Sequence, residues 1–294
     1  MHVLHTIREF RTWRQSAGNT VTFVPTMGAL HEGHASLVRA ARVLADQSSP
    51  RGTVAASIFV NPTQFGPNED FTRYPRTLES DTRMLAAAGC DAVFVPDAKE
   101  MYPTIDATST ASSLLATSID PGPLGNVLEG AIRPGHFRGV CTVVAKLLHI
   151  VQPSHMLLGQ KDYQQQAILR QMCAELNEDL EVVTCPTIRE EDGLAMSSRN
   201  RYLTADERTR AATIYRALEW ARQTYAQGER QAVALEEGMS ARVATAGLIP
   251  QYTHVAHAEN LTLVRNTGGT VQTPAILLIA ALLGKTRLID NMAL

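Results

Sequence analysis

Short apolar runs alternate with amphipathic stretches along residues 21–185. The runs are rich in β-branched and aromatic residues, which predicts buried strands over residues 21–25, 54–60, 91–95, 155–158 and 180–185. Between them, apolar residues recur at helical spacing, which predicts helices over residues 35–44, 78–88, 140–151 and 163–176. Because strands that alternate with helices form a parallel sheet covered on both faces, we predict an α/β, doubly wound (Rossmann-like) fold.

The pattern changes after Thr204. Helical periodicity covers residues 205–226 and 233–246, and strand-like segments follow at 251–255, 275–283 and 287–289. This predicts a smaller C-terminal α+β domain. We therefore expect a Rossmann-like domain over residues 1–186 and a smaller C-terminal lid domain over residues 187–294. The Ser/Thr/Ala-rich stretch 104–118 is expected to be an excursion from the first domain.

Composition narrows the class of protein. Of the 294 residues, 45% are hydrophobic and 19% are charged, which is typical of a globular protein. The formal charge is -2 and no basic run is present, so nucleic acid is not an expected partner. The first ten residues carry charges and no uninterrupted apolar stretch, so they do not resemble a signal peptide. The apolar run 275–283 is about half the length of a membrane span, so we expect no membrane association and a cytoplasmic location. The four cysteines form no Cys-x-x-Cys pair, which argues against a zinc site or a disulfide framework.

A strand, a glycine turn and a helix start coincide at Pro25-Thr-Met-Gly-Ala-Leu-His-Glu-Gly-His34. Backbone N–H groups and the positive end of the helix can face a phosphate there. His31 and His34 are three residues apart, so both project to one side if they lie at the helix start. Two imidazoles can donate to phosphate oxygens as charge builds at an α-phosphorus. A lone histidine would more often be a surface residue, but this pair predicts an ATP-dependent enzyme that forms an acyl adenylate.

Gly159-Gln-Lys-Asp162 repeats the arrangement of strand end, glycine and helix start. In a doubly wound sheet, ligands bind at such positions. Lys161 can reach the β and γ phosphates, and Asp162 can accept from ribose hydroxyls. Because similar loops are common, this segment is weak evidence by itself.

Asp192-Gly-Leu-Ala-Met-Ser-Ser-Arg-Asn200 precedes the change of domain. Ser197, Ser198 and Arg199 can close over a leaving pyrophosphate, a role expected of a mobile loop. A loop of this composition is otherwise usually a solvated connection.

Amide side chains follow two predicted strands, in Ser57-Ile-Phe-Val-Asn-Pro-Thr-Gln-Phe65 and in Tyr163-Gln-Gln-Gln166. Gln64 and Gln165 can hold a small polyhydroxy acid without neutralising the carboxylate that attacks. Exposed glutamines are generally structural, so this hypothesis depends on the histidine turn.

These segments, in this order, resemble the pantothenate synthetase family over nearly the whole chain. Arg73-Tyr-Pro-Arg-Thr77, Gly135-His-Phe-Arg-Gly-Val140 and Arg287-Leu-Ile-Asp-Asn291 extend the resemblance. It implies that pantoate attacks the α-phosphorus of Mg-ATP to give pantoyl adenylate and pyrophosphate, and that β-alanine then displaces AMP. It also implies ATP with Mg²⁺ as the substrate complex, no tightly bound organic cofactor, and a homodimer.

The resemblance further implies roles for individual residues. His34, His31, Lys161 and Arg199 are the expected catalytic residues. The expected ATP site comprises Met27, Gly28, Ala29, Leu30, His31, Glu32, Gly33, His34, Gly159, Gln160, Lys161, Asp162, Ile188, Met196, Ser197, Ser198 and Arg199. The expected substrate site comprises Gln64, Gln165, Asn61 and Tyr74, with Gln64 shared between pantoate and β-alanine.

Two departures from the family pattern stand out. Gln160 replaces a usual Glu beside Lys161, which removes a negative charge but keeps similar hydrogen-bonding reach. Residues 47–52 are longer than the usual turn and are expected to form a surface loop. Ligands for Mg²⁺ are not specified by the sequence, because this ion binds mainly phosphates and water, and Asp81 is the one candidate.

Two other functions stay open at this point. A nucleotidyltransferase could use the same histidine turn with a phosphate ester as nucleophile, and only the product would separate it from a ligase. A non-enzymatic nucleotide-binding protein with a degenerate site would be favoured by loss of either histidine, Lys161 or Arg199. All four are present.

Overall fold

In the computed structural model the chain forms two compact units. Unit 1 comprises Met1–Gly159 and Ile168–Cys185, and unit 2 comprises Gln160–Ala167 and Pro186–Leu294. The structure describes residues 1–18, 20–66, 69, 71–104 and 117–294, so most of the predicted excursion 104–118 lies outside the described residues. The domain boundary after residue 186 stays a prediction.

Unit 1 is built on a six-stranded parallel sheet with the strand order β1-β4-β3-β2-β5-β6. The strands are β1 (His2–Leu4), β2 (Val21–Thr26), β3 (Thr53–Ile58), β4 (Ala92–Phe94), β5 (His155–Gly159) and β6 (Glu181–Cys185). The direction in which strands are added reverses between β2 and β5. In open α/β sheets, ligands bind outside the carboxyl ends of the strands at such a switch point. The predicted doubly wound fold is confirmed.

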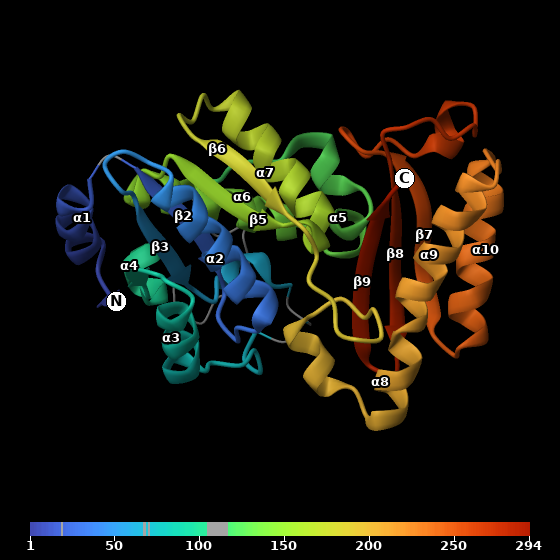
Figure 1. Cartoon of the computed structure of the whole chain (residues 1–294), viewed down its shortest axis with the longest axis horizontal. Coiled ribbons are helices and arrows are strands. Elements are labelled where there is room, and N and C mark those ends of the chain that lie inside the picture. Colours follow the sequence, from blue (N-terminus) through green and yellow to red (C-terminus); the bar gives the residue numbers. More distant parts are fainter. Residues whose placement is uncertain (19, 67–68, 70, 105–116) are drawn as a thin grey trace. The chain divides into compact units, whose positions relative to one another are not determined.

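Helices cover both faces of this sheet (Figure 1). They are α1 (Ile7–Ser16), α2 (Glu32–Asp46), α3 (Leu78–Ala87), α4 (Ala98–Met101), α5 (Glu129–Ile132), α6 (His136–Val151) and α7 (Tyr163–Glu175), with the 3-10 turns η1 (Pro62–Gln64) and η3 (Gly122–Asn126). The 3-10 turn η4 (Gln160–Asp162) and the first residues of α7 belong to unit 2. Adjacent strand residues point to opposite faces, so Phe23 joins the core beneath α1 and α6, whereas Val24 joins the core beneath α2. Two hydrophobic cores therefore hold the sheet in place.

Unit 2 contains a three-stranded antiparallel sheet of order β7-β8-β9, formed by β7 (Ile249–His257), β8 (Ala275–Leu283) and β9 (Thr286–Ala293). Its helices are α8 (Ala205–Ala211), α9 (Thr213–Ala226) and α10 (Ala232–Thr245), preceded by the 3-10 turn η5 (Ser198–Tyr202). Figure 1 shows α9 and α10 side by side against this sheet. Their apolar residues, among them Leu218 and Leu235, share one core with Leu277 and Ile279 of β8. The predicted C-terminal α+β unit is confirmed.

Several elements differ from the sequence-based prediction. The strand β1 and the helix α1 were not predicted, although Thr6 and Glu9 form a capping box at the start of α1. The helix α6 begins at His136, four residues earlier than predicted, and its first turn includes the buried residues His136, Phe137 and Gly139. The single helix expected over 205–226 is two helices that meet at Ala212.

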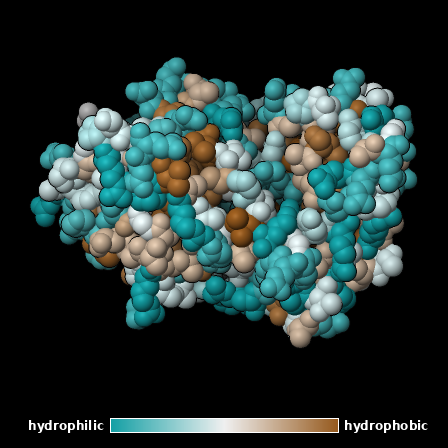
Figure 2. Space-filling model, in the orientation of Figure 1, coloured by the Kyte–Doolittle hydropathy of each residue, from teal (hydrophilic) through white to brown (hydrophobic). Residues whose placement is uncertain are grey.

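Hydrophilic residues cover most of the face drawn in Figure 2, and hydrophobic residues appear there in small groups. Among the described residues, no helix has the length and apolar character needed to cross a membrane. All four cysteines are buried free thiols, as expected for small apolar residues. The segment 47–52 connects α2 to β3.

Candidate active site

Both histidines of the predicted phosphate-binding turn cap the helix α2. His31 is the N-cap residue, and its Nδ1 accepts from the N–H of Gly33 at 3.2 Å. The Nδ1 of His34 accepts from the N–H of His31 at 3.3 Å, and the two ring centroids lie 4.2 Å apart. A neutral imidazole that accepts at Nδ1 carries its proton at Nε2. The turn therefore holds two N–H donors of defined tautomer at a helix N-terminus, as binding of an anion requires.

The backbone of this turn is held by Asp81 of α3. Its buried carboxylate, 2% exposed, accepts from the N–H of Ala29 at 2.9 Å and of Leu30 at 3.0 Å, and also from the Thr77 hydroxyl at 3.0 Å. Gly28 has a φ of 82°, and a Cβ there would lie 3.1 Å from Asp81 Oδ2. Because both carboxylate oxygens are engaged inside the protein, the interpretation of Asp81 as a magnesium ligand does not fit the structure.

The amide of Gln64 is oriented from both ends. Its Nε2 donates to the sulfur of Met27 at 2.8 Å, and its Oε1 accepts from Nδ2 of Asn61 at 3.1 Å. Asn61 is 1% exposed and its Oδ1 accepts from the Tyr102 hydroxyl at 2.8 Å. The structure therefore brings Gln64 together with the turn that follows β2. Asn61 is placed to orient Gln64 from within the protein, and its expected contact with a substrate stays a prediction.

A chain of polar contacts holds the backbone of Gln64 as well. Arg133 pairs with Glu69 through two hydrogen bonds of 2.6 and 2.7 Å. A third donor of Arg133 lies 3.0 Å from Nε2 of His136, so Nδ1 of that ring carries the proton and donates to the Gln64 carbonyl at 2.8 Å. Burial, helped by the charge of Arg133, lowers the pKa of His136 to about 4, so the ring is neutral near pH 7. This chain gives the segment 133–138 a structural role that the sequence alone did not resolve.

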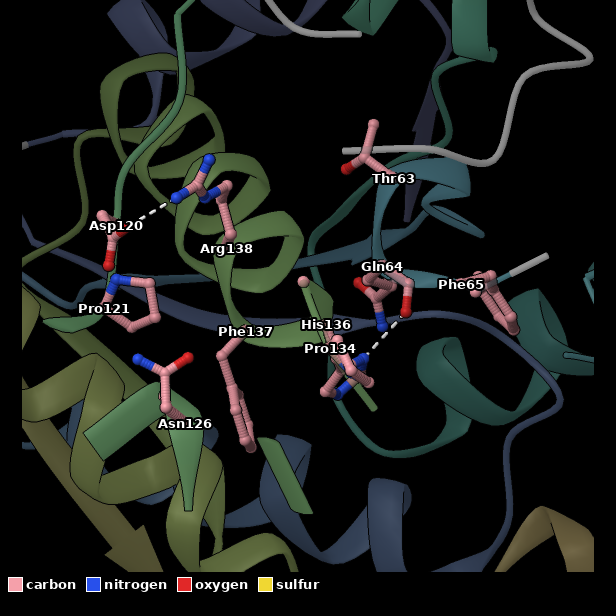
Figure 3. Close-up of a pocket in the computed structure, with 13 residues that line it drawn as sticks. Thr63, Gln64, Phe65, Asp120, Pro121, Asn126, Pro134, His136, Phe137 and Arg138 are labelled. Carbon is pink, nitrogen blue, oxygen red and sulfur yellow. Dashed lines mark hydrogen bonds and ion pairs between the residues drawn. The ribbon is translucent and has the colours of Figure 1, made fainter. Parts of the chain in front are cut away.

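Gln64 and His136 line a cavity of about 380 Å³ in unit 1. Figure 3 shows the His136 ring directed at the backbone of Gln64, and Arg138 paired with Asp120 at another part of the wall. Tyr74, the remaining substrate candidate of unit 1, packs edge-on against Phe65 with ring centroids 5.9 Å apart. The cavity is of the size that small-molecule sites have.

In unit 2, Lys161 lies in the turn η4 between β5 and α7. Its Nζ is 3.5 Å from the Asp162 carboxylate, and its side chain is 19% exposed. Gln165 lies in the first turn of α7 and is half-buried. Asn291 of β9 donates to the backbone carbonyls of Gln160 and Lys161.

The segment expected to be a mobile loop contains a hydrogen-bonded hairpin. The Glu190 N–H donates to the Leu194 carbonyl at 2.8 Å, and the Met196 N–H donates to the Ile188 carbonyl at 3.0 Å. Ser197 then caps η5 by accepting from the N–H of Arg199 at 3.2 Å. Within unit 2, these bonds order the residues that lead to the Ser-Ser-Arg sequence.

Comparison with known proteins decides the family. A family model described as pantoate-beta-alanine ligase matches residues 2–293. The pantothenate synthetase of Neisseria meningitidis serogroup B is 46% identical over 292 residues, which cover 99% of this chain and 98% of the relative. That of Chloroflexus aurantiacus is 49% identical over 295 residues, which cover 100% and 98%. The chain belongs to the pantoate–beta-alanine ligase family.

Solved structures of this family have the same fold. Pantothenate synthetase from Thermus thermophilus superposes with a TM-score of 0.88 at 40% identity and covers 99% of both chains. The pantoate–beta-alanine ligase of Francisella tularensis, complexed with beta-gamma ATP and beta-alanine, gives a TM-score of 0.78 at 35% identity, over 100% of this chain and 97% of that one.

The expected ligase residues fall into two sets. Unit 1 contains Met27 to His34, Asn61, Gln64, Tyr74 and Gly159, and unit 2 contains Gln160, Lys161, Asp162, Gln165, Ile188 and Met196 to Arg199. The sequence did not show which residues hold these sets in place, notably Tyr102, Arg189, Asp290 and Asn291, and it suggested a different role, that of a metal ligand, for Asp81. A local signal existed only for Asp290 and Asn291, which belong to the last motif shared with the ligase family.

Proposed function

We propose that this chain condenses pantoate with β-alanine at the expense of ATP, giving pantothenate, AMP and pyrophosphate through a pantoyl adenylate. Membership of the pantoate–beta-alanine ligase family over residues 2–293 is the observation that carries this proposal. The relative that binds an ATP species and β-alanine supports the choice of substrates. The capped histidine pair supplies donors of the kind that the first step needs.

In the first step a carboxylate oxygen of pantoate attacks the α-phosphorus of ATP, and the bond from that phosphorus to the bridging oxygen of pyrophosphate breaks. No base is needed, because the carboxylate is already an anion. Negative charge grows on the α-phosphate oxygens, and the Nε2–H groups of His31 and His34 are proposed to stabilise it. In the second step the β-alanine amine attacks the acyl carbon, AMP leaves, and the nitrogen loses a proton.

The remaining expected residues take roles that follow from their chemistry. Lys161 and Arg199 are proposed to neutralise the β and γ phosphates that leave as pyrophosphate. Gln64 and Gln165 are proposed to bind pantoate, with Gln64 also near β-alanine. Adenine is proposed to meet the backbone at Ile188, whose carbonyl already accepts one hydrogen bond and has a second lone pair.

Magnesium is proposed to arrive with ATP and to stay bound mainly to phosphate oxygens and water. Within the ranges that the structure describes, no group of three histidine, cysteine or acidic side chains is arranged to hold a metal ion. No tightly bound organic cofactor is proposed.

The family also supports proposals about the state of the protein. We propose a homodimer in the cytoplasm, with small molecules as its only substrates, a nucleotide- and pantoate-binding domain over 1–186 and a lid domain over 187–294. Light scattering during size-exclusion chromatography tests the dimer, and a mass of about 64 kDa, twice the 32.0 kDa of one chain, is expected.

A pyrophosphate-release assay tests the function. With ATP and Mg²⁺ present, release should require pantoate, and AMP and pantothenate should accumulate only after β-alanine is added. Release that needs a phosphate ester in place of pantoate, with a dinucleotide product, would instead identify a nucleotidyltransferase. No release under either condition would contradict the proposal.

A further inference from the structure

The side chain of Asn291 is hydrogen-bonded to the backbone of the turn that contains Lys161. Asn291 lies in β9 and is 2% exposed. Its Nδ2 donates to the carbonyl of Gln160 at 2.9 Å and to the carbonyl of Lys161 at 2.8 Å. The Gln160 side chain returns a longer contact, 3.4 Å from its Nε2 to Oδ1 of Asn291. One buried amide therefore uses both of its donors on two successive backbone carbonyls of this turn.

The neighbouring residue, Asp290, forms an ion pair with Arg189 of the hairpin that precedes Arg199. Its buried carboxylate pairs with Arg189 through bonds of 2.6 and 3.0 Å. Arg189 also donates to the Gly193 carbonyl at 3.0 Å, and its guanidinium lies 4.7 Å from the centre of the Tyr215 ring. A bidentate pair of this kind fixes direction as well as distance.

Asp290 and Asn291 can contact two different segments, the Arg189 hairpin and the Lys161 turn, because successive side chains of a strand point to opposite faces. Asp290 and Asn291 are paired with Ile279 and Leu278 of the central strand β8, so their place on β9 is set by a regular ladder. The segment Gln160–Ala167 belongs to unit 2, although the strand before it and the helical residues after it belong to unit 1. The hydrogen bonds from Asn291 are one physical reason why the segment Gln160–Ala167 belongs to unit 2.

We propose that Asp290 and Asn291 are positioning residues that hold the Lys161 turn and the Arg199 hairpin on one strand, so that the two cations meet the phosphates of ATP in a fixed arrangement. The proposal rests on the proposed function for its account of what the two cations bind. It predicts that Lys161 and Arg199 act as a pair. It also predicts that removal of the Asn291 side chain slows the reaction because Lys161 is displaced.

A double-mutant cycle between Asn291→Ala and Lys161→Ala tests this. In the wild-type background, Asn291→Ala should weaken ATP binding in calorimetry and slow pyrophosphate release by about 10-fold or more, since small misplacements of a positioned group are costly. The KM for pantoate should change by less than about 2-fold. In the Lys161→Ala background, Asn291→Ala should have no further effect, because interacting residues are not additive.

Met292→Ala is the matched control, because it truncates a partly buried side chain of the same strand. It should lower the melting temperature but leave ATP binding within about 2-fold. If Asn291→Ala does not fold, Asn291→Ser, which keeps one donor, is used in the same cycle. Effects of Asn291 that add to those of Lys161→Ala, or an unchanged affinity for ATP, would overturn the inference.

The two proposals fail separately. Calorimetry with ATP alone needs no pantoate. The double-mutant cycle for ATP affinity can therefore be measured even if the wild type releases no pyrophosphate with pantoate. If the wild type releases no pyrophosphate in the presence of pantoate, the proposed function is contradicted. If the effects of Asn291→Ala and Lys161→Ala on ATP binding are additive, the positioning role is contradicted.

Discussion

The N–H of His31 donates to Nδ1 of His34 at 3.3 Å, while Nδ1 of His31 itself accepts from the backbone two residues on. Each ring therefore has one nitrogen committed to the start of α2. The helix that the two rings cap sets both of them in the tautomer that donates from Nε2. This relationship suits the role proposed for the histidines, in which they stabilise charge and do not act as bases.

His34→Ala should slow adenylate formation by about 100-fold or more, the typical loss for one donor at a developing charge. His34→Gln should recover part of this rate, because a glutamine amide can place an N–H near the position of Nε2. His34→Asn should keep the contact with the His31 backbone but not reach the phosphate. Single-turnover pyrophosphate release measures all three.

Circular dichroism and thermal melting are the controls for these variants. Equal rates for His34→Asn and His34→Gln would contradict the role assigned to Nε2. A wild-type rate for His34→Ala with an unchanged fold would remove His34 from the mechanism.

Asp81→Asn should disturb the phosphate-binding turn. The new amide can accept with only one oxygen, so one of the N–H groups of Ala29 and Leu30 loses its partner in a buried place. An unsatisfied buried donor costs about 1–3 kcal/mol, so the free energy of unfolding should fall by that amount and the KM for ATP should rise. Urea unfolding and steady-state kinetics measure the two effects. Recovery of activity at high Mg²⁺ would instead indicate a metal ligand.

His136 should make stability depend on pH below neutrality. Its pKa is about 4 in the folded protein and near 6.5 when unfolded, so the unfolded chain binds the extra proton first. The contribution is complete above pH 6.5 and is lost as pH falls toward 4, by at most about 3 kcal/mol. Urea unfolding between pH 7 and 4.5 should show this slope in the wild type and a smaller one in His136→Gln. Equal slopes would contradict the prediction.

Gln165→Ala should weaken binding of pantoate more than binding of ATP. The proposed amide contact is to the hydroxy acid, and loss of one hydrogen bond should lower affinity for pantoate by about 10-fold. Calorimetry with each ligand measures the difference. Gln171→Ala is the matched control, since Gln171 is an exposed glutamine of the same helix that contacts Glu175. Equal losses for both ligands would argue against the role.

The fold could be predicted from the sequence because its information is local. Residues 21–34 carry a strand, a turn and a helix start in fourteen consecutive positions, and the structure places each as the pattern indicates. The first helix was missed although its signal, Thr6 followed three residues later by Glu9, is equally local. It was hidden because the segment around Phe10 is mostly polar, and only that residue is buried.

The residues that hold the candidate site could not be predicted, because their partners are distant in sequence. Asp81 and Ala29 are 52 positions apart, and Asn291 and Gln160 are 131 apart. Hydrophobic periodicity reports burial but not which polar groups meet. Buried acids and amides such as these become interpretable only when the fold shows which backbone groups they satisfy.

The chain passes between the two units at 159/160, at 167/168 and at 185/186. Severing the protein at the predicted boundary after residue 186 would therefore not yield two self-sufficient pieces. A fragment of residues 187–294 would expose the Asn291 amide, and the hydroxyl of Tyr163, which donates to Ala258 at 2.9 Å, would stay on the other fragment. The small unit includes eight residues from the middle of the chain, Gln160–Ala167, so a fragment that begins at residue 187 lacks a part of its own unit.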